Sequence, residues 1–222
     1  MQTPLQKLCE YLKQQDFSYH LTFIDDWSTD YSSDKITDSI KEYNIPYTVL
    51  QYKKNQWKGH AIQYGIKHSP IQTDFYFLRD IDNATSLEEI SSCINKIQDT
   101  KWLYDIVIGK RVFPHAKRTI TRKLWQLLSG WVIQFFLDIP YKDTQCGCKV
   151  FSKDLKEVAL KAPSMRRWRD FAFLCFAHHT GYKIYEHEVI RKEVPNGHIS
   201  YKDYFITLKE LFMTYRMYRT MK

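Results

Sequence analysis

The chain has 222 residues, a length that suits one α/β domain better than two. With 44% hydrophobic and 26% charged residues it is not an intrinsically disordered chain, and seven glycines and seven prolines are too few for collagen-like or linker sequences. Lys and Arg outnumber Asp and Glu by 33 to 25, which gives a net charge of +8. This balance favours an anionic partner (a phosphorylated substrate, an acidic membrane surface or nucleic acid), although solubility alone explains it equally well.

Cysteines and apolar runs bear on the compartment. The five cysteines are odd in number and scattered, and Cys146 and Cys148 lack a second pair, which disfavours zinc and favours a reducing cytosol. The longest apolar runs, such as Trp131–Leu137, fall short of the roughly 20 residues that a membrane span needs. We therefore expect a chain that is soluble or lies on a membrane surface.

The first half alternates helical and strand patterns. Apolar residues at helical spacing open the chain, and Ser86 with Glu89 forms a capping-box pattern before the fourth helix. Helices are predicted over residues 4–15, 33–43, 58–68 and 86–97, and strands over 20–24, 47–52, 74–78 and 105–108. This alternation predicts an α/β fold with a largely parallel sheet and helices on both faces.

The second half is predicted to contain two long helices of mixed basic and aromatic character. Helices are expected over residues 119–137, 168–179 and 201–221, and a strand over 183–189. Arg118, Arg122 and Lys123 lie at the start of the first helix, and the last alternates Phe, Leu, Met and Tyr with Lys and Arg. The two long helices can cover the core, or they can present a basic, aromatic-edged face to an anionic membrane.

Two acidic clusters follow predicted strands. Asp25 and Asp26, with Asp30 nearby, follow the first strand, and Asp80 and Asp82 follow the third. Ligands of open parallel sheets bind at the carboxyl ends of the strands, and a D-x-D places two hard oxygen ligands where Mg²⁺ or Mn²⁺ can bridge to a diphosphate. For a bare D-x-D, capping and turn formation by aspartate is the commoner explanation, and the second acidic cluster strengthens the functional one.

Seven motifs in register carry a family resemblance. They are FIDDWSTD (23–30), KNQWKGHAIQYGI (54–66), LRDIDNATS (78–86), DIVIGKR (105–111), DTQCGCKVF (143–151), GYKIYEHEV (181–189) and EVPNGHIS (193–200). In this order the chain resembles family-2 glycosyltransferases of the polyprenyl-phosphate type, nearest to the dolichyl-phosphate glucosyltransferase branch and its bacterial relatives, over nearly its whole length. The resemblance implies a GT-A fold, a Rossmann-like nucleotide-diphospho-sugar transferase fold. It also implies inverting transfer of a sugar, glucose favoured, from a UDP-sugar to a polyprenyl phosphate with Mg²⁺ or Mn²⁺.

The resemblance also implies roles for individual residues. Asp82 would be the main metal ligand, assisted by Asp80. The remaining implied site residues are Asp25, Asp26, Asp30 and Lys58 on the nucleotide side, Arg111 and Arg122 at the acceptor phosphate, and Asp143, Gln145 and Lys149 on the sugar and acceptor side. A phosphate acceptor is already an anionic nucleophile, so positioning by arginine matters more than a strong general base.

The chain departs from the family pattern at several positions. Trp27 and Trp57 stand where glycine is usual, and glycine serves where backbone approaches a ligand or takes a positive φ, so we expect a reshaped or blocked nucleotide pocket. Met1 falls inside the helix that follows the usual first strand of the family, so we expect this strand to be missing. The exposed sheet edge would then favour modest stability or a homo-oligomer that covers it. The late Gly-Ser-Lys of the family has His198 in place of the lysine.

Three functions therefore remain open. The first is an active glycosyltransferase, peripheral on the cytoplasmic face of the inner or endoplasmic-reticulum membrane. In it, residues 1–112 would form the nucleotide-sugar half and 113–222 the acceptor half of a single domain. The second is a truncated, inactive homologue of the same fold, and the third is a basic membrane-surface module without sugar chemistry. Nucleic acid is not expected as a partner, because no reader motif is visible.

Overall fold

The computed structural model describes residues 3–82, 84–99, 103–112, 120–163, 169–190 and 201–220, with only the backbone of residues 120–127, 129, 169 and 201–204. The elements in chain order are α1 (Pro4–Lys13), β1 (Leu21–Asp25), α2 (Ser32–Lys41), β2 (Tyr47–Gln51), α3 (Trp57–His68), β3 (Phe75–Leu78), α4 (Glu88–Asp99), β4 (Ile106–Val112), α5 (Ile120–Leu137), β5 (Lys149–Ser152), a short 3₁₀ turn (Lys153–Leu155), α6 (Lys156–Lys161), α7 (Arg169–His179), β6 (Ile184–Ile190) and α8 (Tyr201–Arg219). The predicted helices and strands are all present, with shifted ends, and β5 and α6 are additional to them.

Local sequence explains where the first helix begins. The Thr3 side chain accepts a hydrogen bond from the Gln6 backbone N–H, the Gln6 side chain accepts one from the Thr3 N–H, and Pro4 occupies the first turn. The buried face of α1 consists of Leu5, Leu8, Cys9 and Leu12. At α4 the predicted capping pair takes other partners: the Ser86 hydroxyl donates to Glu88, and Glu89 contacts His187 at 2.9 Å.

The strands form two separate sheets. β1 and β2 pair in parallel, with Leu21 opposite Tyr47 and Asp25 opposite Gln51. The other sheet has the order β3-β5-β4-β6, in which β5 runs antiparallel to β3 and β4, and β4 runs parallel to β6. The α/β class is confirmed, but the prediction of one largely parallel sheet is wrong, because the unpredicted β5 inserts antiparallel between β3 and β4 and no described strand joins the two sheets.

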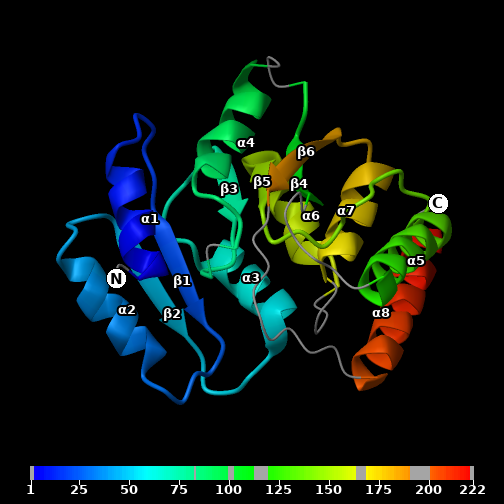
Figure 1. Cartoon of the computed structure of the whole chain (residues 1–222), viewed down its shortest axis with the longest axis horizontal. Coiled ribbons are helices and arrows are strands. Elements are labelled where there is room, and N and C mark those ends of the chain that lie inside the picture. The colour runs from blue at the N-terminus through cyan, green and yellow to red at the C-terminus, as the bar shows by residue number, and fades with distance from the viewer. Residues whose placement is uncertain are drawn as a thin grey trace.

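Helices, rather than strand pairing, connect the two sheets (Figure 1). On one face α3 contacts both of them: Ile62 and Ile66 pack with Tyr76 of β3, and a Cβ on Gly65 would come within 2.7 Å of the side chain of Ile24 in β1. On the opposite face, α1 and α4 pack together over residues of β1 and β3, in a cluster that includes Leu8, Leu12, Ile90, Leu21 and Phe77. The expected helices on both faces are therefore present.

The largest core lies under the four-stranded sheet. It includes the fully buried side chains of Ile106, Ile108, Phe151, Phe171 and Leu174, from β4, β5 and α7. α5 and α8 lie side by side at the end of the molecule away from β1 and β2 (Figure 1). In the described part of the chain, no helix is both long and apolar enough to cross a membrane.

Candidate functional site

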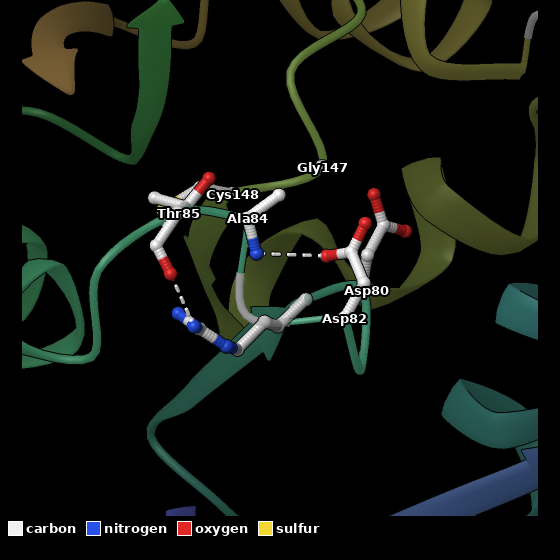
Figure 2. A pocket seen from close by; sticks show the side chains of 7 residues that line it. Asp80, Asp82, Ala84, Thr85, Gly147 and Cys148 are labelled. Atoms are coloured by element: carbon white, nitrogen blue, oxygen red, sulfur yellow. Dashed lines mark hydrogen bonds between the residues drawn. The ribbon is translucent and has the colours of Figure 1, made fainter. Parts of the chain in front are cut away.

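The D-x-D motif lies at the carboxyl end of β3 and borders a small pocket (Figure 2). The pocket is lined by Arg79, Asp80, Asp82, Ala84, Thr85, Gly147 and Cys148, and its volume of about 10 Å³ is on the order of the space that one water molecule needs. Residues from the loop after β3 and from the segment that leads into β5 thus meet at one point.

Asp80 is held from two directions. Its carboxylate accepts a hydrogen bond from the Lys58 ammonium at 2.6 Å, which ties the start of α3 to the end of β3. On another side the backbone of Gly147 approaches so closely that a Cβ there would lie 2.8 Å from the Asp80 carboxyl carbon. A side chain at position 147 would therefore displace the Asp80 carboxylate from this position.

Asp82 is exposed, and its loop is fixed by a neighbouring arginine. The Asp82 carboxylate accepts from the Ala84 backbone N–H at 3.0 Å, while the Arg79 guanidinium donates to the carbonyl oxygens of Thr85 and Ser86. Burial lowers the pKa of Arg79, and the negative charge of Asp82 and Asp80 opposes that effect. Sequence reasoning missed Arg79, although it directly precedes the D-x-D.

The residues present fit a divalent cation that shares its coordination with a ligand. Asp80 and Asp82 supply hard carboxylate oxygens, and Mg²⁺ is commonly held by one or two carboxylates together with substrate phosphates and water. Among the described residues, no group of three or more His, Cys, Asp or Glu side chains could hold a metal alone.

Asp25 forms the buried end of the first acidic cluster. It is 7% exposed and accepts hydrogen bonds from the Ser28 backbone N–H at 2.8 Å, the Gln51 amide at 3.1 Å and the Ser33 hydroxyl. Burial alone would raise the pKa of Asp25, but these hydrogen bonds outweigh it and hold the pKa below its usual value. Ser33 and Gln51, which the sequence analysis did not single out, keep this carboxylate ionised and fixed.

Asp26 connects the two loops beside this cluster. Its carboxylate accepts from the Gln56 backbone N–H at 2.7 Å, and its carbonyl oxygen accepts from the Asn55 side chain at 3.3 Å. Asp30, in contrast, is exposed and accepts from the backbone N–H and hydroxyl of Ser32, at the start of α2. Asp30 thus has a local structural task, whereas Asp26 brings the loop after β1 to the start of α3, next to Lys58.

A buried charge network lies beneath the predicted acceptor side. The Arg111 guanidinium donates to both carboxylate oxygens of Asp143, with Nε at 2.6 Å and Nη2 at 2.8 Å, and the Arg111 backbone N–H donates at 3.0 Å. Burial would raise the pKa of Asp143, but the bonds from Arg111 hold it below the usual range. Because the Asp143 side chain is 6% exposed and that of Arg111 21%, the pair is largely shielded from solvent.

Lys149 extends this network and is almost fully buried. Its ammonium donates to the carbonyl oxygen of Cys146 and lies 3.5 Å from Asp170. The Gln145 backbone N–H donates to Asp143 at 3.3 Å, so the segment from 143 to 149 is folded around its own charges. Gly147, which faces Asp80, belongs to the same segment. The side chain of Arg122 lies outside the described residues.

These contacts place most of the predicted residues along one path. Asp26 binds the residues that precede Lys58, Lys58 binds Asp80, and Asp80 contacts the segment that holds Asp143 and Lys149. The path runs along the carboxyl ends of β1 and β3, where ligands bind in open α/β sheets. Two of the predicted side chains, Arg111 and Lys149, are paired with the acidic residues Asp143 and Asp170.

Comparison with solved structures identifies the class of fold. The structure is similar to glucosyl-3-phosphoglycerate synthase from Mycobacterium tuberculosis in complex with UDP (TM-score 0.64, 11% identity, 96% of this chain and 77% of that one). It is also similar to a mannosyltransferase from Pyrobaculum calidifontis in complex with GDP-Man and Mn²⁺ (TM-score 0.59, 13% identity, 88% and 55%). The fold is thus the GT-A fold, as the sequence predicts.

Sequence comparison then gives the family. The model of glycosyl transferase family 2 matches residues 3–158, and the chain belongs to that family. A dolichyl-phosphate beta-glucosyltransferase from Trichomonas vaginalis is 28% identical over 186 residues, which cover 82% of this chain and 57% of that protein. The chain thus spans about half the length of the curated relatives that it matches.

Proposed function

We propose that this chain transfers a hexose, with glucose favoured, from a UDP-sugar to a polyprenyl or dolichyl phosphate. The observation that carries the proposal is the pair of carboxylates after β3, which border a small pocket, within a chain of glycosyl transferase family 2. Two further findings support it: the dolichyl-phosphate beta-glucosyltransferases among the relatives, and neighbours of the same fold that bind UDP or GDP-Man with Mn²⁺.

In this proposal, different residues along the path contact the nucleoside and the diphosphate of the donor. Asp25 and Asp26 would contact the nucleoside, and Asp80 and Asp82 would hold a divalent cation. Such a cation would neutralise the charge that develops on the leaving group. Lys58, already beside Asp80, supplies a second positive charge at the diphosphate.

The acceptor side needs positioning more than proton transfer. An oxygen of the acceptor phosphate attacks the anomeric carbon, the bond from that carbon to the donor diphosphate breaks, and UDP leaves with the bonding electrons. The attack comes from the face opposite the leaving group, so the configuration inverts. Asp143 fixes the orientation of Arg111, whose remaining N–H groups would meet the acceptor phosphate together with Arg122.

Nucleotide binding and turnover test the proposal separately. Calorimetry with UDP and Mn²⁺ should show binding by the wild type that Asp82→Ala loses and that Asp38→Ala, at an exposed position on α2, retains. Incubation with UDP-glucose, Mn²⁺ and a polyprenyl phosphate should give a glucosylated lipid detectable by mass spectrometry. Binding without turnover would favour the inactive homologue, and no binding at millimolar UDP would refute the donor assignment.

We also propose that the molecule lies on a membrane through an apolar face of α5 and α8. The exposed large side chains of this α5–α8 face are Leu128, Trp131, Phe135 and Phe136 on α5 and Phe205, Leu208, Phe212, Met213 and Met217 on α8. On α8, two polar residues, Glu210 and Thr214, are buried, whereas Phe205 is 75% exposed. Exposed large apolar side chains on two packed helices favour an interaction site, and the exposed Lys209, Arg216 and Arg219 suit anionic headgroups.

Vesicle flotation tests this surface. Binding should be stronger to vesicles that contain anionic lipid than to neutral ones, and high salt should release only part of the protein, because apolar insertion is insensitive to salt. The double variant Phe205→Glu/Phe212→Glu should lose most of the binding, whereas Ile71→Glu, also at an exposed apolar position but before β3, should keep it. Negligible binding to both vesicle types at low salt would contradict the membrane assignment.

A further inference from the structure

Two tryptophans occupy backbone positions that favour glycine. Trp27 has a φ of 65° and Trp57 a φ of 71°, both in the left-handed region, where a side chain crowds the backbone. Neither ring gains full burial in return, because Trp27 is 51% exposed and Trp57 42% exposed. A bulky residue in this region is uncommon, and such outliers concentrate at ligand-binding sites.

The residues that precede the two tryptophans are hydrogen-bonded to each other: Trp27 lies in the loop after β1, and Trp57 is the first residue of α3. Trp27 follows Asp26, and Trp57 follows Gln56, whose backbone N–H donates to the Asp26 carboxylate at 2.7 Å. The carboxyl ends of β1 and β2 lie at the side of the molecule where α3 begins (Figure 1). Ligands of parallel sheets bind at this edge. The buried Asp25 is the last residue of β1, two residues before Trp27.

We propose that Trp27 and Trp57 form the contact surface for the base of the donor nucleotide. The proposal rests on the donor assignment made above. A half-exposed indole offers a flat aromatic face, which stacks on a nucleobase, and an aspartate beside it accepts hydrogen bonds from ribose hydroxyls or from base N–H groups. Glycine at positions 27 and 57 would offer no side chain to the base, whereas the two indole rings would contact it.

The test separates the base from the diphosphate. The variants Trp27→Gly and Trp57→Gly, and their combination, are compared with the wild type for binding of UDP, GDP and inorganic pyrophosphate in the presence of Mn²⁺. Each substitution should weaken binding of the preferred nucleotide by about tenfold or more and leave pyrophosphate binding unchanged. Quenching of tryptophan fluorescence by that nucleotide should fall in parallel. The matched control is Ile71→Gly, at an exposed apolar position before β3, which should change none of these values.

Stability measurements exclude a merely structural role. Glycine relieves a positive φ, so neither variant should melt at a lower temperature than the wild type by more than a few degrees. Trp27→Asn and Trp57→Asn, which also tolerate this backbone region, provide a second set if a glycine variant folds poorly. If the rings were structural, melting temperature and affinity for both nucleotide and pyrophosphate would fall together, and the proposal would be wrong.

The remaining outcomes distinguish this proposal from the donor assignment. Wild-type binding of UDP or GDP that survives within twofold in the double variant overturns the role of the tryptophans and leaves the donor assignment intact. Failure of the wild type to bind either nucleotide, with Mn²⁺ present, overturns both.

Discussion

Replacing Asp143 by asparagine should destabilise the protein more than any surface charge substitution. The change keeps the shape of the side chain but removes its charge, and Asp143 accepts four hydrogen bonds, three from Arg111 and one from the Gln145 backbone. An asparagine has only one carbonyl oxygen, so its amide NH₂ group would face N–H donors of Arg111 and could not accept from them. Arg111 would keep its charge, largely shielded from solvent, without its carboxylate.

The size of the effect follows from burial. Removing one partner of a buried, hydrogen-bonded ion pair typically costs about 3–5 kcal/mol, a large part of the roughly 5–15 kcal/mol that stabilises a domain. Urea unfolding at neutral pH should therefore show a midpoint lower by roughly 1–2 M. The control is Asp74→Asn, which breaks the ion pair with Lys153 at 3.2 Å, where both side chains are more than 60% exposed, and which should cost about 1 kcal/mol or less.

The same pair makes a prediction about pH. The pKa of Asp143 is lower in the folded protein than in the unfolded chain, so its contribution to stability is complete above the unfolded value of about 4 and is lost as pH falls through the folded value. Between about pH 5 and pH 3 the wild type should thus lose more stability than Asp143→Asn does. Equal urea midpoints for Asp143→Asn and Asp74→Asn, or parallel acid profiles of wild type and Asp143→Asn, would refute this reasoning.

Two further predictions concern the carboxylate site and the divided sheet. Gly147→Ala should displace Asp80 and weaken binding of UDP with Mn²⁺ at least several-fold, whereas Gly130→Ala, where a Cβ meets its nearest atom at 3.5 Å, should not; equal binding by both would contradict the steric role. In hydrogen-exchange mass spectrometry, β1 and β2 should exchange before β4 and β5, because a two-stranded sheet whose strands are only partly buried opens more readily than the buried centre of the other sheet. Equal protection of β1 and β4 from exchange would contradict this prediction. Protection of β1 in an oligomer would indicate that another strand covers the edge of the two-stranded sheet.

Local patterns predicted most of the helices and strands but not the order and direction of the strands in the sheets. The spacing of Leu5, Leu8, Cys9 and Leu12 predicted α1 because a helix buries residues three and four apart, and the structure buries all four. β5, in contrast, has only four residues and begins with Lys149, so no strand pattern marks it. It exists because Phe151 and Val150 pair with β3 and β4, and such long-range pairing is not encoded in local periodicity.

At the site, too, the sequence indicated which residue types matter but not which contacts they make. The D-x-D and the acidic residues after β1 were recognisable, because carboxylates at strand ends indicate ligand binding. The resemblance could not show that Arg111 forms a bidentate ion pair with Asp143, or that Arg79 donates to the loop that follows Asp82. Both contacts depend on the folded geometry. On α8 the helix was predicted, but the burial of Glu210 and Thr214, with the apolar residues turned outward, depends on how the helix packs beside α5.

The division of the sheet has a consequence for the proposed donor site. Asp25 and Asp26 belong to the two-stranded sheet, whereas Asp80 belongs to the four-stranded one, so the nucleoside and diphosphate ends of a donor would contact different sheets. Their spacing is set by α3, through Gln56 and Lys58 at its start and Gly65 against Ile24 further along. A ligand that contacts both sheets would bridge them where no described strand does, and the free energy of binding would stabilise their arrangement. In this proposal the residues at the start of α3 would therefore link base recognition to the carboxylate site.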